Sequence, residues 1–316
     1  MIQRVLFPLL LALLLSALAA CVGMEPRKSP DALRTVAYLP YYRMDTIQPA
    51  WFSAVDDLMY YNVKPKPSGE LDASNFNRDA LLQIRSLSRD TNMRIMLTVG
   101  GWKESSGFGP MATDEKLRKE FIRRLLVFCR EHDFDGVDFD WEFPETPEED
   151  RAYSLLLVET KRAFRLHRML VTVAVGHAQR LSPEAYQAVD HVHLMSYDHG
   201  TVFPTYEGGV ADVQRQLAFG VPKEKLYLGV PFFGRNQKDR NDAVSYADLI
   251  LKYNPPPDSD LSGNYYFNGI RTIQKKVRFA REQGLAGMMI WELGQDTADH
   301  RSLLRALTEE IRHLRN

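Results

Sequence analysis

Residues 135–142 read Asp-Gly-Val-Asp-Phe-Asp-Trp-Glu, and this stretch decides how the chain folds. Apolar and acidic residues alternate along it, which is the period of a β-strand whose side chains point to opposite faces in turn. Asp138, Asp140 and Glu142 therefore share one face of the strand. Because like charges at neighbouring positions repel, at least one of these carboxyl groups is expected to hold a proton near neutral pH. The pattern predicts a strand with a row of acids whose proton has a chemical use.

Two other interpretations of the acidic row compete with proton chemistry. A solvated strand face is one, but Val137, Phe139 and Trp141 make the opposite face apolar, and the neighbouring strands also read as buried. A calcium or magnesium site is the other, since carboxylates are hard oxygen ligands. Three acids on one strand form a line rather than a cage. Proton chemistry is therefore the preferred interpretation, and no metal is expected.

The composition is that of a globular protein. The chain has 316 residues, of which 45% are hydrophobic and 26% charged, so it can bury a sizeable core in one large or two small domains. The formal net charge is −1, and the two signs are interspersed without a basic stripe. This pattern argues against a nucleic-acid partner and against a surface that binds anionic membranes.

The N-terminal segment has the features of a secretory signal peptide. Arg4 precedes an apolar run over residues 5–15, and the segment ends in Leu-Ala-Ala-Cys at residues 18–21. Small residues before a cysteine resemble the lipobox of bacterial lipoproteins, in which Cys21 would be lipidated and become the first mature residue. An ordinary signal peptide with a coincidental cysteine is the alternative.

The lipoprotein interpretation sets the domain boundaries. Residues 1–20 would be the signal peptide, residues 21–33 a tether to the membrane, and residues 34–316 the folded domain. Val22 follows the cysteine, where some Gram-negative lipoproteins have an Asp that changes their sorting. By this resemblance we expect the protein to be anchored in the outer membrane of the cell envelope. With the other cysteine lipidated, Cys129 is expected to be a buried thiol on the apolar stripe of a helix.

Short apolar runs alternate with helical patterns along the rest of the chain. Such alternation favours parallel strands, and runs of consecutive Val, Ile, Leu and Met are typical of a sheet covered on both faces. Eight such units fit a single (β/α)8 TIM barrel, whereas a doubly wound sheet is disfavoured because no Gly-x-Gly-x-x-Gly turn follows the first strand. The expected strands are 35–40, 57–63, 94–100, 136–142, 169–175, 189–197, 225–232 and 287–292. The expected helices are 77–89, 114–130, 148–166, 210–219, 272–282 and 300–314.

Polar and aromatic residues gather at the ends of these predicted strands, where a barrel of this kind places its active site. An aromatic wall with a few acids suits a sugar, whose ring faces are apolar and whose edges form hydrogen bonds. Core packing is the alternative for any single aromatic residue. The residues concerned are Tyr38, Tyr41, Tyr61, Asn62, Trp102, Asp140, Glu142, Met195, Tyr197, Asp198, Phe232, Phe233, Arg235, Trp291 and Glu292.

Four motifs resemble the signatures of glycoside hydrolase family 18, the chitinase family. Residues 135–142 are similar to its Asp-x-x-Asp-x-Asp-x-Glu strand-four motif. Thr-Val-Gly-Gly-Trp at 98–102 resembles its Ser-x-Gly-Gly, with Thr replacing Ser, and Met-Ser-Tyr-Asp at 195–198 resembles its Met-x-Tyr-Asp. Residues 287–291 resemble its strand-eight tryptophan segment. The resemblance covers roughly residues 35–315.

The resemblance implies retaining, substrate-assisted hydrolysis of β-1,4 bonds in glycans that contain N-acetylglucosamine, without a cofactor. Glu142 would be the general acid, and the substrate's N-acetyl carbonyl would attack the anomeric carbon. Asp140 would orient the acetamide, Asp138 would share a proton with Asp140, and Tyr197 would bind the acetamide oxygen. Further substrate contacts would come from Trp291, Tyr38, Trp102, Met195, Asp198 and Arg235.

Two features of the chain depart from many secreted chitinases. The segment 233–286 between strands seven and eight is too short for their large α+β insertion, and no carbohydrate-binding module is evident. A shallower cleft suits soluble oligosaccharides or a cell-envelope glycan. His191 and His193 lie inside the predicted strand 189–197 and are interpreted as packing or edge residues.

Several functions remain in competition. A chitinase-like hydrolase that acts as a monomer leads, with an endo-β-N-acetylglucosaminidase or a peptidoglycan-related glycan hydrolase as alternatives. A glycan-binding lectin on the same barrel is a different class, but such relatives typically lose the acidic Glu, and Glu142 is present. An envelope scaffold has only the tether in its favour.

Overall fold

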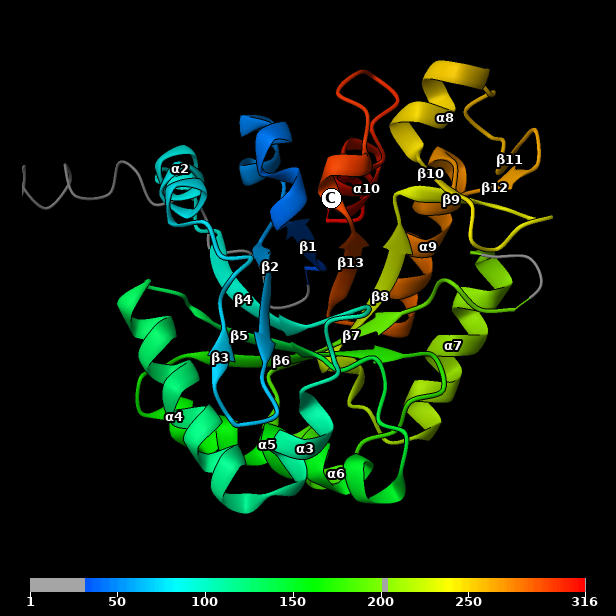
Figure 1. Ribbon diagram of the computed structural model, residues 1–316. Coiled ribbons are helices and arrows are strands. Elements are labelled where there is room, and N and C mark those ends of the chain that lie inside the picture. Colours follow the sequence, from blue (N-terminus) through cyan, green and yellow to red (C-terminus); the bar gives the residue numbers. More distant parts are fainter. Residues whose placement is uncertain (1–31, 201–203, 316) are drawn as a thin grey trace, which may run out of the picture. The chain divides into compact units, whose positions relative to one another are not determined.

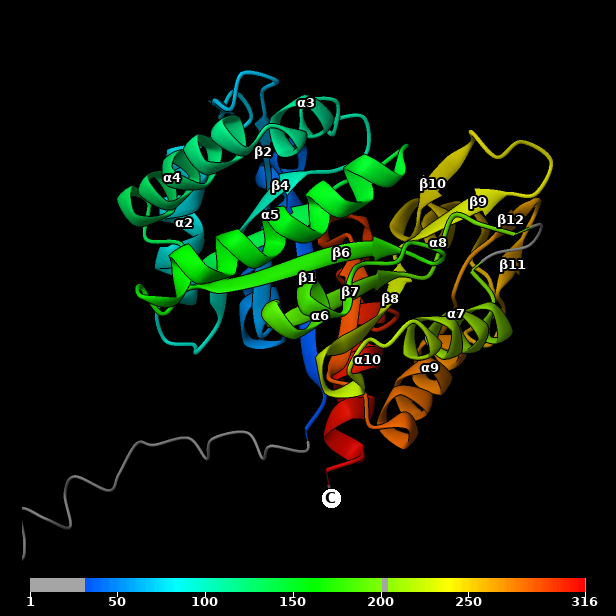
Figure 2. The same ribbon diagram turned by 90° about the horizontal axis from the view of Figure 1, so that it is seen from below.

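The structure, a computed structural model, describes residues 32–200 and 204–315. The predicted signal peptide, Cys21 and most of the tether lie outside the described residues. The folded unit starts at Leu33 and holds a ring of parallel strands with helices on its outer side (Figures 1 and 2). No helix in these described ranges is long and apolar enough to cross a membrane.

Eight parallel strands close into a barrel in the described part of the chain. Their order is β1-β13-β8-β7-β6-β5-β4-β2, and a second pairing between β1 and β2 closes the ring. The single (β/α)8 barrel predicted from the sequence is confirmed, and each predicted strand is present within a few residues. The strands are β1 Arg34–Pro40, β2 Asp57–Pro65, β4 Arg94–Gly100, β5 Gly136–Asp140, β6 Leu170–Gly176, β7 His191–Met195, β8 Leu226–Pro231 and β13 Gly287–Trp291. The short β3, Leu71–Asp72, extends β2 as an antiparallel edge.

Capped amphipathic helices surround the barrel. The α5 helix begins with a capping box in which Thr146 and Glu149 satisfy each other's backbone N–H groups, and Asp114 caps α4 through the N–H of Leu117. The main helices are α2 Arg78–Ser88, α4 Glu115–Glu131, α5 Pro147–Arg165, α7 Tyr206–Ala218, α9 Ile270–Gln283 and α10 Leu303–His313. Shorter elements that the sequence did not predict are α3 Phe108–Thr113, α6 Pro183–Ala188, α8 Tyr246–Tyr253, η1 Tyr41–Thr46, η2 Pro49–Ser53, η3 Lys223–Lys225 and η4 Leu293–Gln295.

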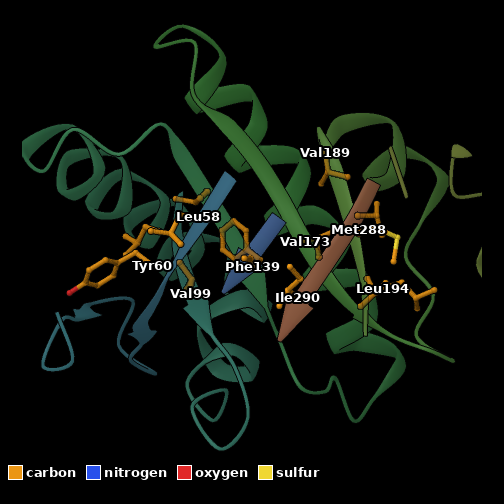
Figure 3. Close-up of a cluster of buried hydrophobic side chains, with 14 of the residues drawn as sticks. Leu58, Tyr60, Val99, Phe139, Val173, Val189, Leu194, Met288 and Ile290 are labelled. Carbon is orange, nitrogen blue, oxygen red and sulfur yellow. The ribbon is translucent and has the colours of Figure 1, made fainter. Parts of the chain in front are cut away.

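Strand alternation divides the core into two layers. Outward-facing side chains such as Phe139, Val173 and Ile290 pack between the strands and the helices (Figure 3). Inward-facing side chains fill the barrel with a smaller cluster that includes Tyr38, Tyr61 and Met289. Burial of the outer layer supplies most of the apolar area that stabilises the fold, because that cluster is much the larger.

A small antiparallel sheet follows β8 and precedes α9. It consists of β9 Phe233–Asn236, β10 Ala243–Ser245, β11 Leu261–Ser262 and β12 Tyr265–Tyr266 in the order β10-β9-β12-β11. Together with α8 it occupies one side of the barrel beyond the end of β8 (Figures 1 and 2). The segment is thus compact, in agreement with the prediction that no large insertion separates the last two barrel strands.

Candidate active site

The acidic row lies at the end of β5. Asp138 and Asp140 are strand residues with exposed fractions of 0% and 3%, and Glu142 follows the strand and is partly buried. The strand ends at Asp140, so the predicted end at residue 142 is corrected by two residues. Trp141, on the opposite side, stacks on Phe108 of α3 with ring centroids 5.0 Å apart. This apolar contact anchors the strand end from which Glu142 projects.

Asp138 is enclosed by donors from three other strands. One carboxylate oxygen accepts a hydrogen bond from the hydroxyl of Tyr38 on β1, at 2.7 Å. The other oxygen accepts from the hydroxyl of Thr172 on β6, at 2.6 Å, and lies 3.1 Å from Nδ1 of His193 on β7. Both carboxylate oxygens of Asp138 thus have partners within hydrogen-bond distance, and these partners hold the side chain in place.

Asp140 has the opposite surroundings. Its Oδ1 is buried and has no hydrogen-bond partner among the described residues. Burial raises the pKa of Asp140 well above its usual value, and the nearby charges of Glu142 and Asp138 raise this pKa further. These surroundings favour the protonated form of Asp140, and its free oxygen is an acceptor that remains available.

Glu142 has a pKa suited to acid–base work. Burial, followed by the charge of Asp198, raises its pKa to about 7, while a hydrogen bond from the backbone of Trp102 partly opposes this shift. The backbone N–H of Glu142 donates to Oγ of Ser105, at 3.0 Å. A carboxylic acid that titrates near the working pH can both give and take a proton.

The Gly100–Gly101 pair allows β4 to pass close to the acids. Gly100 and Gly101 have φ angles of 92° and 112°, a region that L side chains rarely adopt. A Cβ atom on Gly101 would lie 1.8 Å from the hydroxyl oxygen of Tyr61, and the Gly101 N–H donates to the backbone oxygen of Asp140 at 2.6 Å. A Cβ atom on Gly100 would lie 2.5 Å from the backbone oxygen of Asp140, so a larger residue there would displace the end of β5.

Aromatic side chains pack beside the acids. The Trp291 ring is partly buried, with centroids 5.5 Å from Tyr38 and 5.1 Å from Tyr61. The Tyr197 hydroxyl lies 3.8 Å from Sδ of Met289. Burial and then the charge of Asp140 raise the pKa of Tyr197, so its hydroxyl remains protonated and can donate a hydrogen bond. The site thus combines an apolar platform with a phenolic donor.

The side chains around the acid row differ in kind from a cluster of metal ligands. In the described ranges, no group of three or more His, Cys, Asp or Glu side chains is placed to hold a metal. The side chains around Asp138 are two hydroxyl groups and an imidazole, which supply hydrogen bonds. The two aspartates therefore differ in their surroundings, because Asp138 has partners on both oxygens whereas Oδ1 of Asp140 has none among the described residues.

Comparisons with known proteins identify the family to which this arrangement belongs. The sequence model described as "Glycosyl hydrolases family 18" matches residues 34–296, which cover the whole ring of strands. The chain belongs to this family. The strand-four motif and its three supporting motifs therefore stand in a family 18 barrel at the positions that the sequence predicted.

Several relatives show how the chain compares within family 18. Probable chitinase 2 of Drosophila melanogaster is 26% identical over 273 residues, which are 65% of this chain and 56% of that protein. The chain therefore spans little more than half of this curated relative. The chitinase ChiB from the chitin utilization locus of Flavobacterium johnsoniae has a TM-score of 0.82 at 27% identity, over 90% of this chain and 95% of that one. A class V chitinase from Nicotiana tobaccum in complex with NAG4 shares the fold, with a TM-score of 0.76 at 21% identity over 89% and 99% of the two chains.

The predicted substrate contacts lie at several depths of the family 18 site. Trp102, directly after β4, is 64% exposed, while Met195 at the end of β7 is partly buried. Asp198 and Arg235 form an ion pair in which Nε of Arg235 lies 3.0 Å from Oδ1 of Asp198. Tyr38 is 1% exposed and donates its hydroxyl to Asp138, and its contact with a sugar stays a prediction.

Two neighbours of Asp138 were missed by sequence reasoning. His193 was interpreted as a packing or edge residue, yet it is fully buried inside the barrel beside Asp138. Its position could have been found, because it has the same strand parity as Met195 and Tyr197, which were predicted to line the site. Thr172 gave no such signal, since its partnership depends on the register between β5 and β6, which pairs it with Asp138.

Proposed function

We propose that the protein hydrolyses β-1,4 glycosidic bonds in N-acetylglucosamine-containing glycans, with retention of configuration and with participation of the substrate. The observation that carries this proposal is the division of labour along the acid row. Glu142 has a pKa of about 7, and Asp140 is a buried acid with an unpartnered oxygen. Glu142 can give a proton to the oxygen of a leaving group, and the free oxygen of Asp140 can accept a hydrogen bond from an amide N–H. The pair therefore suits a substrate that has both groups.

The first step uses the proton of Glu142. Glu142 protonates the glycosidic oxygen while the carbonyl oxygen of the substrate's N-acetyl group bonds to the anomeric carbon, and the glycosidic bond breaks. The products are a free alcohol and a cyclic oxazolinium, and Glu142 is left as a carboxylate. In the second step this carboxylate takes a proton from water, and the water oxygen bonds to the anomeric carbon from the face that the leaving alcohol left. The bond between the anomeric carbon and the acetamide oxygen breaks, which restores the N-acetyl group with retained configuration.

Asp140 and Tyr197 orient the acetamide for this attack. The free Oδ1 of Asp140 can accept the hydrogen bond of the acetamide N–H, which aligns the carbonyl with the anomeric carbon. The Tyr197 hydroxyl can donate to the acetamide oxygen. Asp138, with its enclosed negative charge, balances the positive charge that develops on the oxazolinium. These roles require an N-acetyl group, so the substrate class follows from the residues.

The aromatic residues and the ion pair provide the remaining contacts. Trp291 offers an apolar face beneath a sugar ring, and the exposed Trp102 offers another at the rim. Asp198 and Arg235 supply polar groups for hydroxyls. The named chitinases of family 18 support chitin oligosaccharides as substrates, with N-glycan cores and peptidoglycan-related glycans as alternatives.

Release of 4-methylumbelliferone from the chitobioside and the chitotrioside tests this function. The mature protein should cleave at least one of them, and Glu142→Gln should lower kcat about 1,000-fold, because the general acid is lost. Glu148→Gln, an exposed Glu in the first turn of α5, is the matched control and should retain parental activity. If the protein binds these sugars but cleaves no glycan of the class, it is a lectin. Equal cleavage by Glu142→Gln would remove Glu142 from the mechanism.

We also propose that the protein is held in the cell envelope by a lipid on Cys21, with the outer membrane as the destination. The small residues before the cysteine and Val22 after it support this proposal. Cys21→Ala should move the protein from the membrane fraction to the soluble fraction, and mass spectrometry of the parental N-terminus should find acyl chains. Unchanged fractionation of the variant would contradict lipid anchoring.

A further inference from the structure

His193 occupies an unusual position for a residue inside a barrel strand. It is fully buried on β7, with Nδ1 3.1 Å from Oδ1 of Asp138 and 3.3 Å from the hydroxyl oxygen of Tyr38. The Tyr38 and His193 rings meet edge to face, with centroids 6.3 Å apart. The imidazole is thus locked beneath the acid row by contacts on its Nδ1 side.

Asp138 is the carboxylate that lies next to His193 among the described residues. They are Tyr38 from β1, Asp138 from β5, Tyr227 from β8 with a ring centroid 5.3 Å away, and His191 from its own strand at 6.5 Å. On β6 its paired residue is Ala174, whose side chain has no polar group. An Nδ1–H on His193 therefore has a carboxylate as its natural acceptor.

This contact affects the proton count of the two aspartates. Tyr38 and Thr172 already donate to Asp138, so a bond from His193 makes a third donor to one buried carboxylate. Each donor stabilises the carboxylate form of Asp138. Each donor therefore makes it harder for the Asp138–Asp140 pair to bind a second proton. Two interacting carboxyl groups titrate as a pair, and the form with one proton persists over the range between their two apparent pKa values.

We propose that His193 is a positioning residue that donates Nδ1–H to Asp138 and keeps the Asp138–Asp140 pair at one proton, with the negative charge on Asp138. Its effect on the rate rests on the proposed function, in which that charge balances the oxazolinium. Without this donor the pair binds its second proton at a higher pH, and the enzyme loses the required charge sooner as the solution is acidified.

Two amide substitutions distinguish this role from simple packing. In His193→Asn the amide ends near the position of Nδ1 and can still donate to Asp138. In His193→Gln the amide reaches the position of Nε2 and misses the carboxylate. For His193→Gln we expect kcat to fall about 10-fold with KM within about 2-fold, and the acidic limb of the kcat/KM profile to move up by about one pH unit. His193→Asn should keep the parental limb.

His191→Gln provides the matched control. His191 lies two residues earlier on the same strand, and neither of its ring nitrogens has a partner among the described residues, so it makes no bond to Asp138. Its acidic limb should stay at the parental pH. Thermal unfolding of each variant shows that the compared proteins are folded. A parental acidic limb in folded His193→Gln, or equal shifts in the Asn and Gln variants, would overturn the proposal.

A measurement on the parental protein decides the contact without activity. The ¹⁵N shifts of the His193 ring, assigned through contacts with Tyr38 protons, should show a proton on Nδ1. A ring protonated on Nε2 alone would overturn the proposal even if both amide variants failed to fold. If the parent cleaves no glycan, the proposed function fails, while this spectrum still reports whether His193 donates to Asp138.

Discussion

The two ends of the barrel each bury an aspartate, and they treat it in opposite ways. At the N-terminal end, Asp57 is 1% exposed and binds Arg94 and Arg34, the first residues of the neighbouring strands β4 and β1. At the C-terminal end, Asp140 is 3% exposed and one of its oxygens has no partner among the described residues. Burial alone would raise the pKa of both groups.

The arginines decide the difference between these aspartates. Burial acts to raise the pKa of Asp57, but the hydrogen bonds and charges of Arg94 and Arg34 outweigh it and hold the pKa below its usual range. At Asp140, burial and then the charges of Glu142 and Asp138 all act in the same direction and raise the pKa. The ion pairs of Asp57 with the arginines contribute to stability. Oδ1 of Asp140, which has no partner among the described residues, remains free to accept a hydrogen bond. This matches the general division of such barrels into a stability end and an active end.

The largest expected effect is loss of turnover in Asp140→Asn. The amide keeps the volume of the carboxyl group but can turn its NH2 group toward the acetamide N–H that Oδ1 of Asp140 would accept, so kcat should fall about 100-fold to 1,000-fold. The free energy of unfolding, measured by denaturant titration, should stay within about 1 kcal/mol of the parent. A large loss of stability would mean that Asp140, like Asp57, stabilises the fold. It would contradict the inference that the two ends of the barrel use their buried aspartates differently.

The next effect is loss of stability in Arg94→Met. Asp57 would then remain buried with Arg34 as its ion-pair partner, and we expect a loss of about 2–3 kcal/mol in the free energy of unfolding. Turnover per folded molecule should be unchanged. Arg124→Met, which breaks the exposed pair with Glu120 on α4, is the control and should leave the free energy of unfolding close to that of the parent. An inactive but stable Arg94→Met would contradict the assignment of that end to stability.

The pH dependence sharpens the comparison at the active end. Because the pKa of Glu142 is about 7 and the acid form is needed, kcat/KM should fall above pH 7 and approach a tenfold loss per pH unit. Asp198→Asn removes a charge that raises this pKa, so the alkaline limb should move to lower pH whatever the absolute rate. A profile that stays flat well above neutrality would show that Glu142 is not the titrating acid.

The smallest expected effect concerns the rim. Trp102→Ala should raise KM for a chitotrioside about 5-fold with little change in kcat, because a stacked sugar ring contributes about 1 kcal/mol of binding. Leu166→Ala removes another exposed apolar side chain, just after α5, and should leave KM unchanged. Isothermal titration with an inactive Glu142→Gln background would measure the same difference as binding. Equal effects of the two substitutions would remove Trp102 from the site.

Much of the barrel was predictable because burial on both faces leaves a direct mark on sequence. Strands such as β4 and β6 are runs of apolar residues, and the alternation along β5 predicted that Asp138 and Asp140 share one face of the strand. The end of β5 was less predictable. The backbone leaves the sheet after Asp140, although apolar and acidic residues alternate as far as Glu142. Alternation shows which way side chains point, and it does not show where the backbone hydrogen bonds of the sheet end.

The small sheet after β8 could not be predicted in this way. Strands such as β11 and β12 have two residues each, and two residues are too few to show the alternation of apolar and polar residues that marks a strand in a sequence. The partners of Asp138 depended on strand neighbours that are far apart in sequence. Tyr38 is 100 residues from Asp138 and Thr172 is 34, and only the closed ring brings them together.

Cys129 gives the molecule a built-in reporter of its own opening. Its thiol is fully buried on α4, and burial raises its pKa, so a thiol-directed reagent finds no thiolate while the barrel is intact. Labelling must wait until α4 separates from the strands, and the labelling rate of the unmodified protein therefore measures how often the outer layer comes apart. In a lipid-anchored form, in which Cys21 is acylated, Cys129 would be the one cysteine left to react with the reagent. The labelling rate would then report the opening of the barrel in the membrane-bound protein.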